Sequence, residues 1–249
     1  MIARVRRRAP VVVLAMAVAF LARPAAGQFP DTFTNLRVLP KDIPKAELEA
    51  TMRGFAFALG VRCNHCHVEK ADRKLDFAAD DRDEKKTARV MLRMVAAINH
   101  DYVGTIGKAS PIRVECVTCH RGLTQPRTLN AILAEAAAKD GIEAAIAQYR
   151  DLREKYYGTG QYDFGETPLN QLTESFLHAD KNKEAVAIME LNFAANHPRS
   201  VWAYHMLAMA HEANGEIEKA LADYRQVVLL HPDDAWAKRQ IEALSARKK

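Results

Sequence analysis

Two copies of one five-residue pattern constrain this chain more than any other feature. Residues 63–67 (CNHCH) and 116–120 (CVTCH) both read C-x-x-C-H, and they use all 4 cysteines of the chain. In this pattern each thiol forms a thioether to one porphyrin, and the histidine that follows ligates its iron. The sequence therefore predicts two covalently attached haem c groups. The predicted attachment residues are Cys63, Cys66, Cys116 and Cys119, and the predicted iron ligands are His67 and His120.

Other uses of paired cysteines fit the sequence less well. A four-cysteine zinc site usually has about 12–20 residues between its two pairs, whereas the gap from Cys66 to Cys116 is far longer. A thioredoxin-like dithiol needs a βαβ context, which the pattern does not indicate. A disulfide between cysteines three positions apart is strained.

The N-terminal segment is typical of a secretory signal peptide. Arg4 and residues 6–8 supply positive charge before the apolar run 11–21, and the small residues 25–27 follow. The run is shorter than the ~20 residues that a membrane-spanning helix needs. We predict cleavage after Gly27, a periplasmic location and no membrane span after cleavage; an uncleaved anchor is the alternative.

The charge balance gives no indication of a nucleic-acid partner. The formal net charge is +5 with a pI near 9.0. Residues 1–27 contain five arginines and no acidic residue, so the chain is neutral after the predicted cleavage.

Composition changes near Thr128, where a second domain is expected to begin. Both motifs and most loop residues precede this position, and an alanine-rich, helix-periodic region without cysteine follows it. We predict a diheme cytochrome domain at 28–127 and a repeat domain at 128–249. Strand signals are scarce, and only 113–117 reads as a short extended segment.

The first haem unit is predicted to be a helix, a turn and a motif. Asp42 and Pro44 indicate the helix start, and Gly60 its end. Met52 shares the apolar face of this helix, so its thioether is the predicted sixth iron ligand, opposite His67.

The second unit repeats this order with a longer connection. Acidic residues at 80–84 precede a helix expected from Lys86 to about Tyr102, and a loop at 103–113 leads to the second motif. Met94 is the predicted ligand opposite His120; Met91 and His100 remain alternatives.

The second domain repeats itself at a spacing of 35 residues. Tyr204, Leu207, Ala220, Tyr224 and Pro232 sit at the signature positions of the tetratricopeptide repeat. A looser earlier copy is expected from helices at 129–139 and 141–155. A helix at 235–246 reads as a polar cap. Docking of a protein is the expected use of such a stack, with a packing or dimerising appendage as the alternative.

The residues around the motifs resemble the cytochrome c subunit of photosynthetic reaction centres. The resemblance covers about 35–127. It rests on NLRVLP at 35–40, MRGF at 52–55, LGVRC at 59–63, TAR at 87–89 with Met94, and VTCHRG at 117–122. It implies that each upstream helix supplies an axial methionine, Met52 and Met94. Members from reaction centres carry four haems, so this chain resembles a soluble diheme relative that serves respiration or another periplasmic redox chain.

The sequence thus predicts an all-α protein, in which helix–turn–CxxCH units precede an α-solenoid of tetratricopeptide-like pairs. A six-coordinate haem with histidine and methionine ligands transfers single electrons. We predict an electron carrier, without substrate turnover, whose repeats dock it to another cytochrome or a membrane electron-transport complex. The alternatives are a haem enzyme of peroxidase or reductase type with one open iron site, and a haem-containing assembly scaffold.

Overall fold

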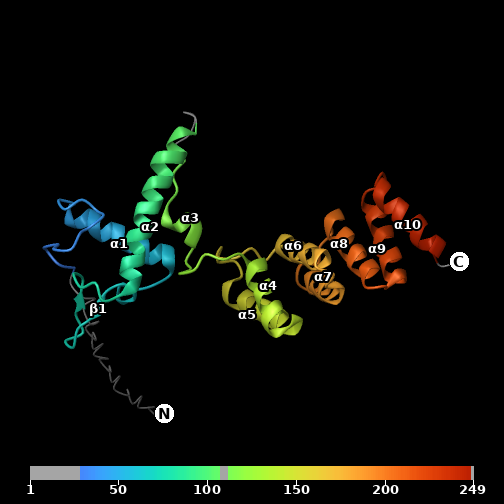
Figure 1. The fold of residues 1–249 in the computed structure, drawn as a ribbon, viewed down its shortest axis with the longest axis horizontal. Coiled ribbons are helices and arrows are strands. Elements are labelled where there is room, and N and C mark those ends of the chain that lie inside the picture. The colour runs from blue at the N-terminus through green and yellow to red at the C-terminus, as the bar shows by residue number, and fades with distance from the viewer. Residues whose placement is uncertain (1–28, 107–111, 248–249) are drawn as a thin grey trace, which may run out of the picture.

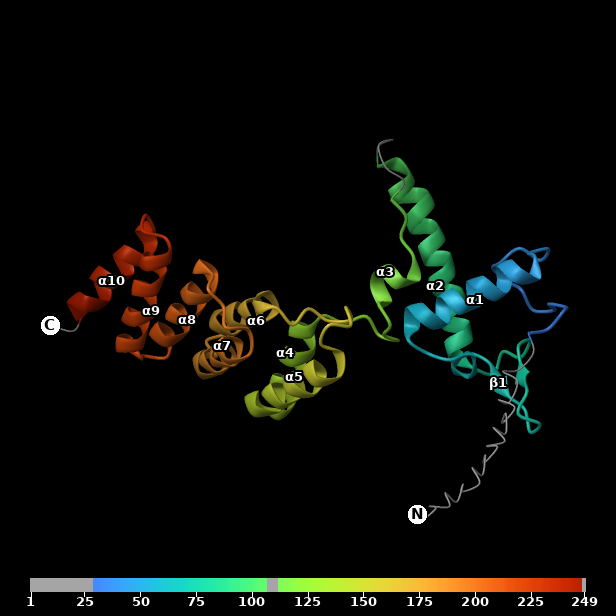
Figure 2. The ribbon, with the colours of Figure 1, turned by 180° about the vertical axis from the view of Figure 1, so that it is seen from behind.

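The computed structural model describes residues 29–106 and 112–247, and the predicted signal peptide lies outside them. The described chain is predominantly helical, as the sequence predicts. Figures 1 and 2 show an elongated molecule, with helices α1–α3 at one end and α4–α10 following one another toward the C-terminus. Within the described residues, none of the helices is long and apolar enough to cross a bilayer.

Helix α1 (Lys45–Leu59) carries the first candidate methionine and ends as predicted. Gly60 is its C-cap and has φ of 67°, a left-handed conformation in which glycine carries no steric penalty. The predicted start is wrong in detail. Pro44, not Asp42, is the N-cap, and no side chain caps the helix, since the proline side chain has no hydrogen-bond acceptor.

A β-hairpin follows the first motif and was not expected. The motif begins with the 3₁₀ turn η1 (Cys63–His65), and the antiparallel strands β1 (Val68–Glu69) and β2 (Leu75–Asp76) come next. The turn between the strands uses Arg73 at φ of 64°. Strands of two residues are too short for a periodic sequence signal.

Helix α2 (Asp83–Ala97) begins earlier than predicted and does not continue regularly to Tyr102. It passes into the π turn η2 (Ile98–Tyr102) and the 3₁₀ turn η3 (Val103–Thr105). Asn99 lies at this transition. Its side-chain amide donates to Val95 O at 3.0 Å and to Val114 O at 2.7 Å, and its Oδ1 accepts from Val114 N at 2.8 Å.

The second motif forms a short helix, so the predicted extended segment at 113–117 is wrong from Cys116 onward. Helix α3 spans Cys116–His120. Glu115 and Thr118 form a reciprocal capping box at its start, which satisfies backbone donors that a helix leaves free.

Two glycines bring the two haem motifs together. Gly122 N donates to Ala58 O in α1 at 2.8 Å. A Cβ at Gly60 would lie only 2.3 Å from Gly122 O. The end of α1 therefore lies directly against the backbone that follows α3, and only glycine allows this approach.

Paired helices form the rest of the chain, close to the predicted ranges. They are α4 (Leu129–Asp140), α5 (Ile142–Tyr156), α6 (Glu166–His178), α7 (Asn182–Asn196), α8 (Val201–Ala213), α9 (Ile217–Leu230) and α10 (Ala235–Arg247). The signature positions Ala220 and Tyr224 are fully buried, as are Leu169 and Ala185, which lie 35 residues before Tyr204 and Ala220. The small alanines let neighbouring helices approach, which is how repeat stacks build a continuous core.

Candidate functional site

The first motif opens into a large cavity that also contains the predicted methionine. Cys63, Cys66, His67 and Met52 all line this cavity of about 1040 Å³. Its walls come from the N-terminal segment 29–39, α1, the hairpin and α2. Cavities that enclose organic ligands usually measure about 300–1,000 Å³, so the space suits a group as large as a porphyrin.

The imidazole of His67 is kept neutral. Burial, with the nearby cations Lys85 and Arg89, lowers the pKa of His67 to about 4. Its ring centroid lies 4.9 Å from that of Phe77. A neutral imidazole is the form that binds a metal. Two thiols, a thioether and a neutral histidine on one cavity of this size fit the donor set of haem c.

Half-buried positive charge forms part of the cavity wall. Arg89 and Lys85 line it from α2 and bind the carboxylate of Asp80 at 2.8 and 3.2 Å. Asn35 donates to the same carboxylate at 2.9 Å, and these partners hold the pKa of Asp80 well below its usual range.

Lys85 is further fixed by the backbone. Its Nζ donates to the carbonyls of Phe77, Ala78 and Ala79 at 2.7–3.1 Å. Asp80 was predicted only as one of the acidic residues before the helix, and this cluster was not predicted. The spacing of four between Lys85 and Arg89 was the available signal, since it places both cations on one helix face.

His120 of the second motif is oriented by a hydrogen bond. It is 8% exposed, and its Nδ1 lies 2.7 Å from Leu123 O. With a carbonyl as the partner, Nδ1 carries the proton and Nε2 keeps its lone pair for a metal. His67 differs, because its buried Nδ1 has no hydrogen-bond partner in the described part of the chain.

The residues predicted as candidates for the sixth ligand of a second haem all come from α2 or the turn that follows it. Met94 is 44% exposed and Met91 is partly buried. The side chain of His100 is 89% exposed and lies 2.6 Å from Asp101 through Nδ1. Val90, one helical turn before Met94, is also exposed. Val90 and Met94 thus form an exposed apolar pair on one helix face, which calls for an explanation. A flat hydrophobic group such as a porphyrin would cover this pair.

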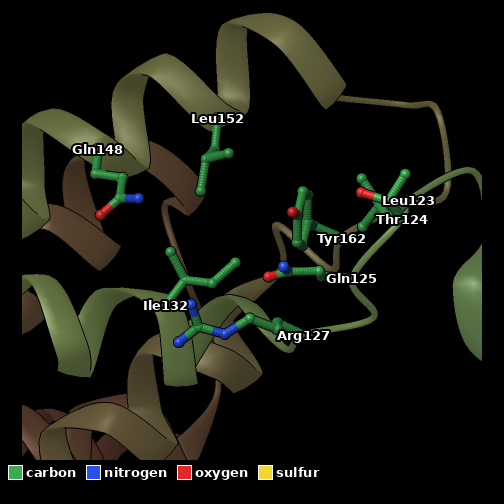
Figure 3. A pocket seen from close by; sticks show the side chains of 8 residues that line it. All are labelled: Leu123, Thr124, Gln125, Arg127, Ile132, Gln148, Leu152 and Tyr162. Atoms are coloured by element: carbon green, nitrogen blue, oxygen red, sulfur yellow. The ribbon is translucent and has the colours of Figure 1, made fainter. Parts of the chain in front are cut away.

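A smaller cavity lies where the second motif meets the repeats. It measures about 270 Å³ (Figure 3). Leu123, Thr124, Gln125 and Arg127 line it from the segment after α3. Ile132 of α4, Gln148 and Leu152 of α5, and Tyr162 of the following loop complete it.

Two models of known protein families match the chain. The model of the photosynthetic reaction centre cytochrome c subunit matches residues 7–190, and a tetratricopeptide repeat model matches 201–241. Both matches confirm resemblances seen in the sequence. The first extends beyond the expected 35–127 and crosses the predicted domain boundary at 127/128.

Individual relatives match only parts of the chain. Cytochrome c-554 of Chloroflexus aurantiacus is 33% identical over 94 residues, which are 37% of this chain and 21% of that protein. The chain thus covers about a fifth of this curated relative. The first tetratricopeptide domain of human RPAP3 has a TM-score of 0.34 at 19% identity, and covers 47% of this chain and 87% of that domain. The Arabidopsis OM64 domain has a TM-score of 0.33 at 21% identity, with 47% and 94% covered.

Proposed function

Since the chain belongs to the family of the photosynthetic reaction centre cytochrome c subunit, we propose that it is a diheme cytochrome c that transfers single electrons. The observation that carries this proposal is the first cavity, which brings Met52, Cys63, Cys66 and His67 to one space of porphyrin size. Family membership supports covalently bound haem c.

The two sites are assigned as follows. Cys63 and Cys66 attach the first haem, and His67 and Met52 ligate its iron. Cys116 and Cys119 attach the second, and His120 and Met94 are its ligands. The hydrogen bond from His120 to Leu123 O and the exposed face of α2 at Met94 support the second set.

The ligands determine the chemistry. Haem c supplies a one-electron couple, and an axial methionine raises its reduction potential. The protein holds both ligands in place, so that little rearrangement accompanies a change of charge. His67 stays neutral through burial, and the cations at Lys85 and Arg89 offset negative charge beside the cavity.

The repeats are proposed to dock the cytochrome to a redox partner. Residues 28–127 form the haem domain and 128–249 the repeat domain, with α10 as its cap. The partner is another cytochrome or a membrane electron-transport complex. The predicted signal peptide at 1–27 supports export, so we place the mature protein in the periplasm.

Absorption spectra of the mature holoprotein test the proposal. We expect two haems by mass, low-spin spectra in both oxidation states, and a near-infrared sulfur–iron band. Met52→Ala and Met94→Ala should each remove about half of that band. A high-spin haem that binds carbon monoxide in the unmodified protein would contradict the carrier and favour a haem enzyme.

A further inference from the structure

The backbone that follows the second motif lies close to two other parts of the chain. Gly122 N donates to Ala58 O of α1 at 2.8 Å. A Cβ at Gly122 would lie 2.9 Å from Nε2 of Gln161. The side chain of Gln161, in the loop between α5 and α6, therefore packs next to this backbone.

The next residue, Leu123, connects the second candidate iron ligand to the repeats. Its carbonyl accepts the hydrogen bond from His120 Nδ1 at 2.7 Å, and its amide donates to His120 O at 2.9 Å. Leu123 also lines the junction cavity together with Leu152 and Tyr162 of the repeat region, as Figure 3 shows.

Tyr162 is itself anchored in the repeat core. Its ring centroid lies 5.3 Å from that of Tyr156 and 6.1 Å from that of Phe164. Phe164 is buried in the cluster that contains Leu133, Tyr149 and Leu169. The wall of the junction cavity is thus part of a packed hydrophobic core, which moves little.

From these contacts we propose that the loop carrying Gln161 and Tyr162 is a positioning element for the second haem. It holds the backbone of Gly122 and Leu123 so that the Leu123 carbonyl keeps the His120 ring in one orientation and one tautomer. The inference rests on the proposed function, because it takes His120 as an iron ligand. The repeats are then part of the redox centre as well as a docking surface.

The effect on the iron has a defined sign. A hydrogen bond at Nδ1 raises the basicity of a ligating histidine, and a more basic ligand favours ferric iron. Weakening the hydrogen bond between His120 Nδ1 and the Leu123 carbonyl therefore raises the reduction potential of the second haem. The first haem is an internal reference, since His67 Nδ1 has no such hydrogen bond within the described residues.

Potentiometric titration of the full-length holoprotein tests the proposal with Tyr162→Ala. We expect the reduction potential of the second haem to rise, while that of the first haem is unchanged. Tyr162→Phe keeps the ring and should restore the value of the unmodified protein. Leu229→Ala on α9, where the side chain is 72% exposed, is the matched control and should change neither potential. The two redox waves are assigned with Met52→Ala and Met94→Ala, because each substitution should shift the potential of its own haem.

Gln161→Ala provides a second variant that leaves the aromatic core in place. It should raise the reduction potential of the second haem by less than Tyr162→Ala does. The proposal is overturned if both variants leave the second potential unchanged, or if the two haems shift equally. A Met94→Ala spectrum that remains unchanged would refute the methionine assignment alone, since the Tyr162 variants still report on His120. A mass showing no haem at the second motif would refute both.

Discussion

Arg89 places a guanidinium on the wall of the first cavity, where it favours the less positive, reduced haem. We predict that Arg89→Gln lowers the potential of the first haem. Removing this positive charge should make the more positive, oxidised haem easier to form, because the Coulomb repulsion between the two charges is lost. Spectroelectrochemistry measures the change.

Arg93 offers the matched control for this charge. It lies one helical turn further along α2, is exposed and does not line the cavity. Arg93→Gln should leave the potential almost unchanged because water screens an exposed charge. Equal shifts in both variants would mean that only the net charge matters.

Asp80 is the anion that holds the cations of this cluster. Because its pKa is lowered in the folded protein, its carboxylate stabilises the fold above about pH 4, the pKa of an aspartate in an unfolded chain, and this contribution is lost as the pH falls further. We predict that Asp80→Asn lowers the stability at pH 7 and weakens the acid dependence below pH 4. Urea unfolding at several pH values measures both.

Asp83→Asn is the control for that experiment, since Asp83 is exposed and is paired with the exposed Lys86. Asp83→Asn should lower the free energy of unfolding far less than Asp80→Asn does. Identical losses in the two variants would argue that the cluster at Asp80 is an ordinary surface ion pair.

Gly60 combines a left-handed backbone with a close contact. We predict that Gly60→Ala destabilises the protein by more than about 2 kcal/mol, because the left-handed conformation costs about 1–2 kcal/mol and the new Cβ meets Gly122 O. Gly158 has φ of 76° with open space around it, so Gly158→Ala should show the conformational cost alone. Thermal unfolding measures the loss of stability in each variant. Equal losses in Gly60→Ala and Gly158→Ala would mean that the contact with Gly122 O contributes nothing.

Among the elements, α2 connects the two haem units. Ala88, Arg89 and Leu92 line the first cavity, whereas Val90 and Met94 lie exposed on the same helix. The turn after α2 is tied to the second motif by Asn99 and Val114. One helix thus contributes to both candidate sites.

We predict that Asn99→Ala loosens the approach to the second motif. It removes two hydrogen bonds to the backbone of Val114, at a cost of about 1–3 kcal/mol for groups left unpaired. Hydrogen exchange should rise at 112–120 and remain unchanged at α1. Asn130→Ala is the control, since it removes side-chain hydrogen bonds to Gln171 at 3.3 Å and from Ala131 N at 3.0 Å, both away from the second motif. Unchanged exchange at 112–120 would rule out this role of Asn99.

Local patterns predicted the elements that depend on local interactions. Gly60 as a helix end and the helix predicted at 129–139, which spans Leu129–Asp140, are examples, because capping and helical periodicity act within a few residues. The cluster of Asn35 with Asp80 and the pairing of Asn99 with Val114 join residues far apart in the chain. Such contacts leave no short-range pattern, so one sequence alone does not predict them.

At the scale of the whole molecule, the family match ends at 190 and the repeat match begins at 201. We predict that a variant ending at Pro198 keeps both haem spectra and both potentials, because the junction with Tyr162 remains. Its helical signal should melt at a lower temperature, since Met189 loses its buried neighbours Ala203 and Met206. Circular dichroism and Soret absorbance, followed together, measure this. If the truncated variant loses the second low-spin haem, then residues of α8–α10 help to hold that haem.

The way the first cavity is enclosed has a consequence for biogenesis. Its walls come from the segment 29–39, α1, the hairpin and α2, so it is complete only when the chain through Leu92 has folded. In the finished cavity Cys66 is half-buried, and burial raises the pKa of its thiol, which makes it a poor nucleophile. We therefore predict that haem is attached before this part of the chain closes. Haem attachment is then coupled to folding. A chain that folds before attachment no longer presents these cysteines to the maturation machinery.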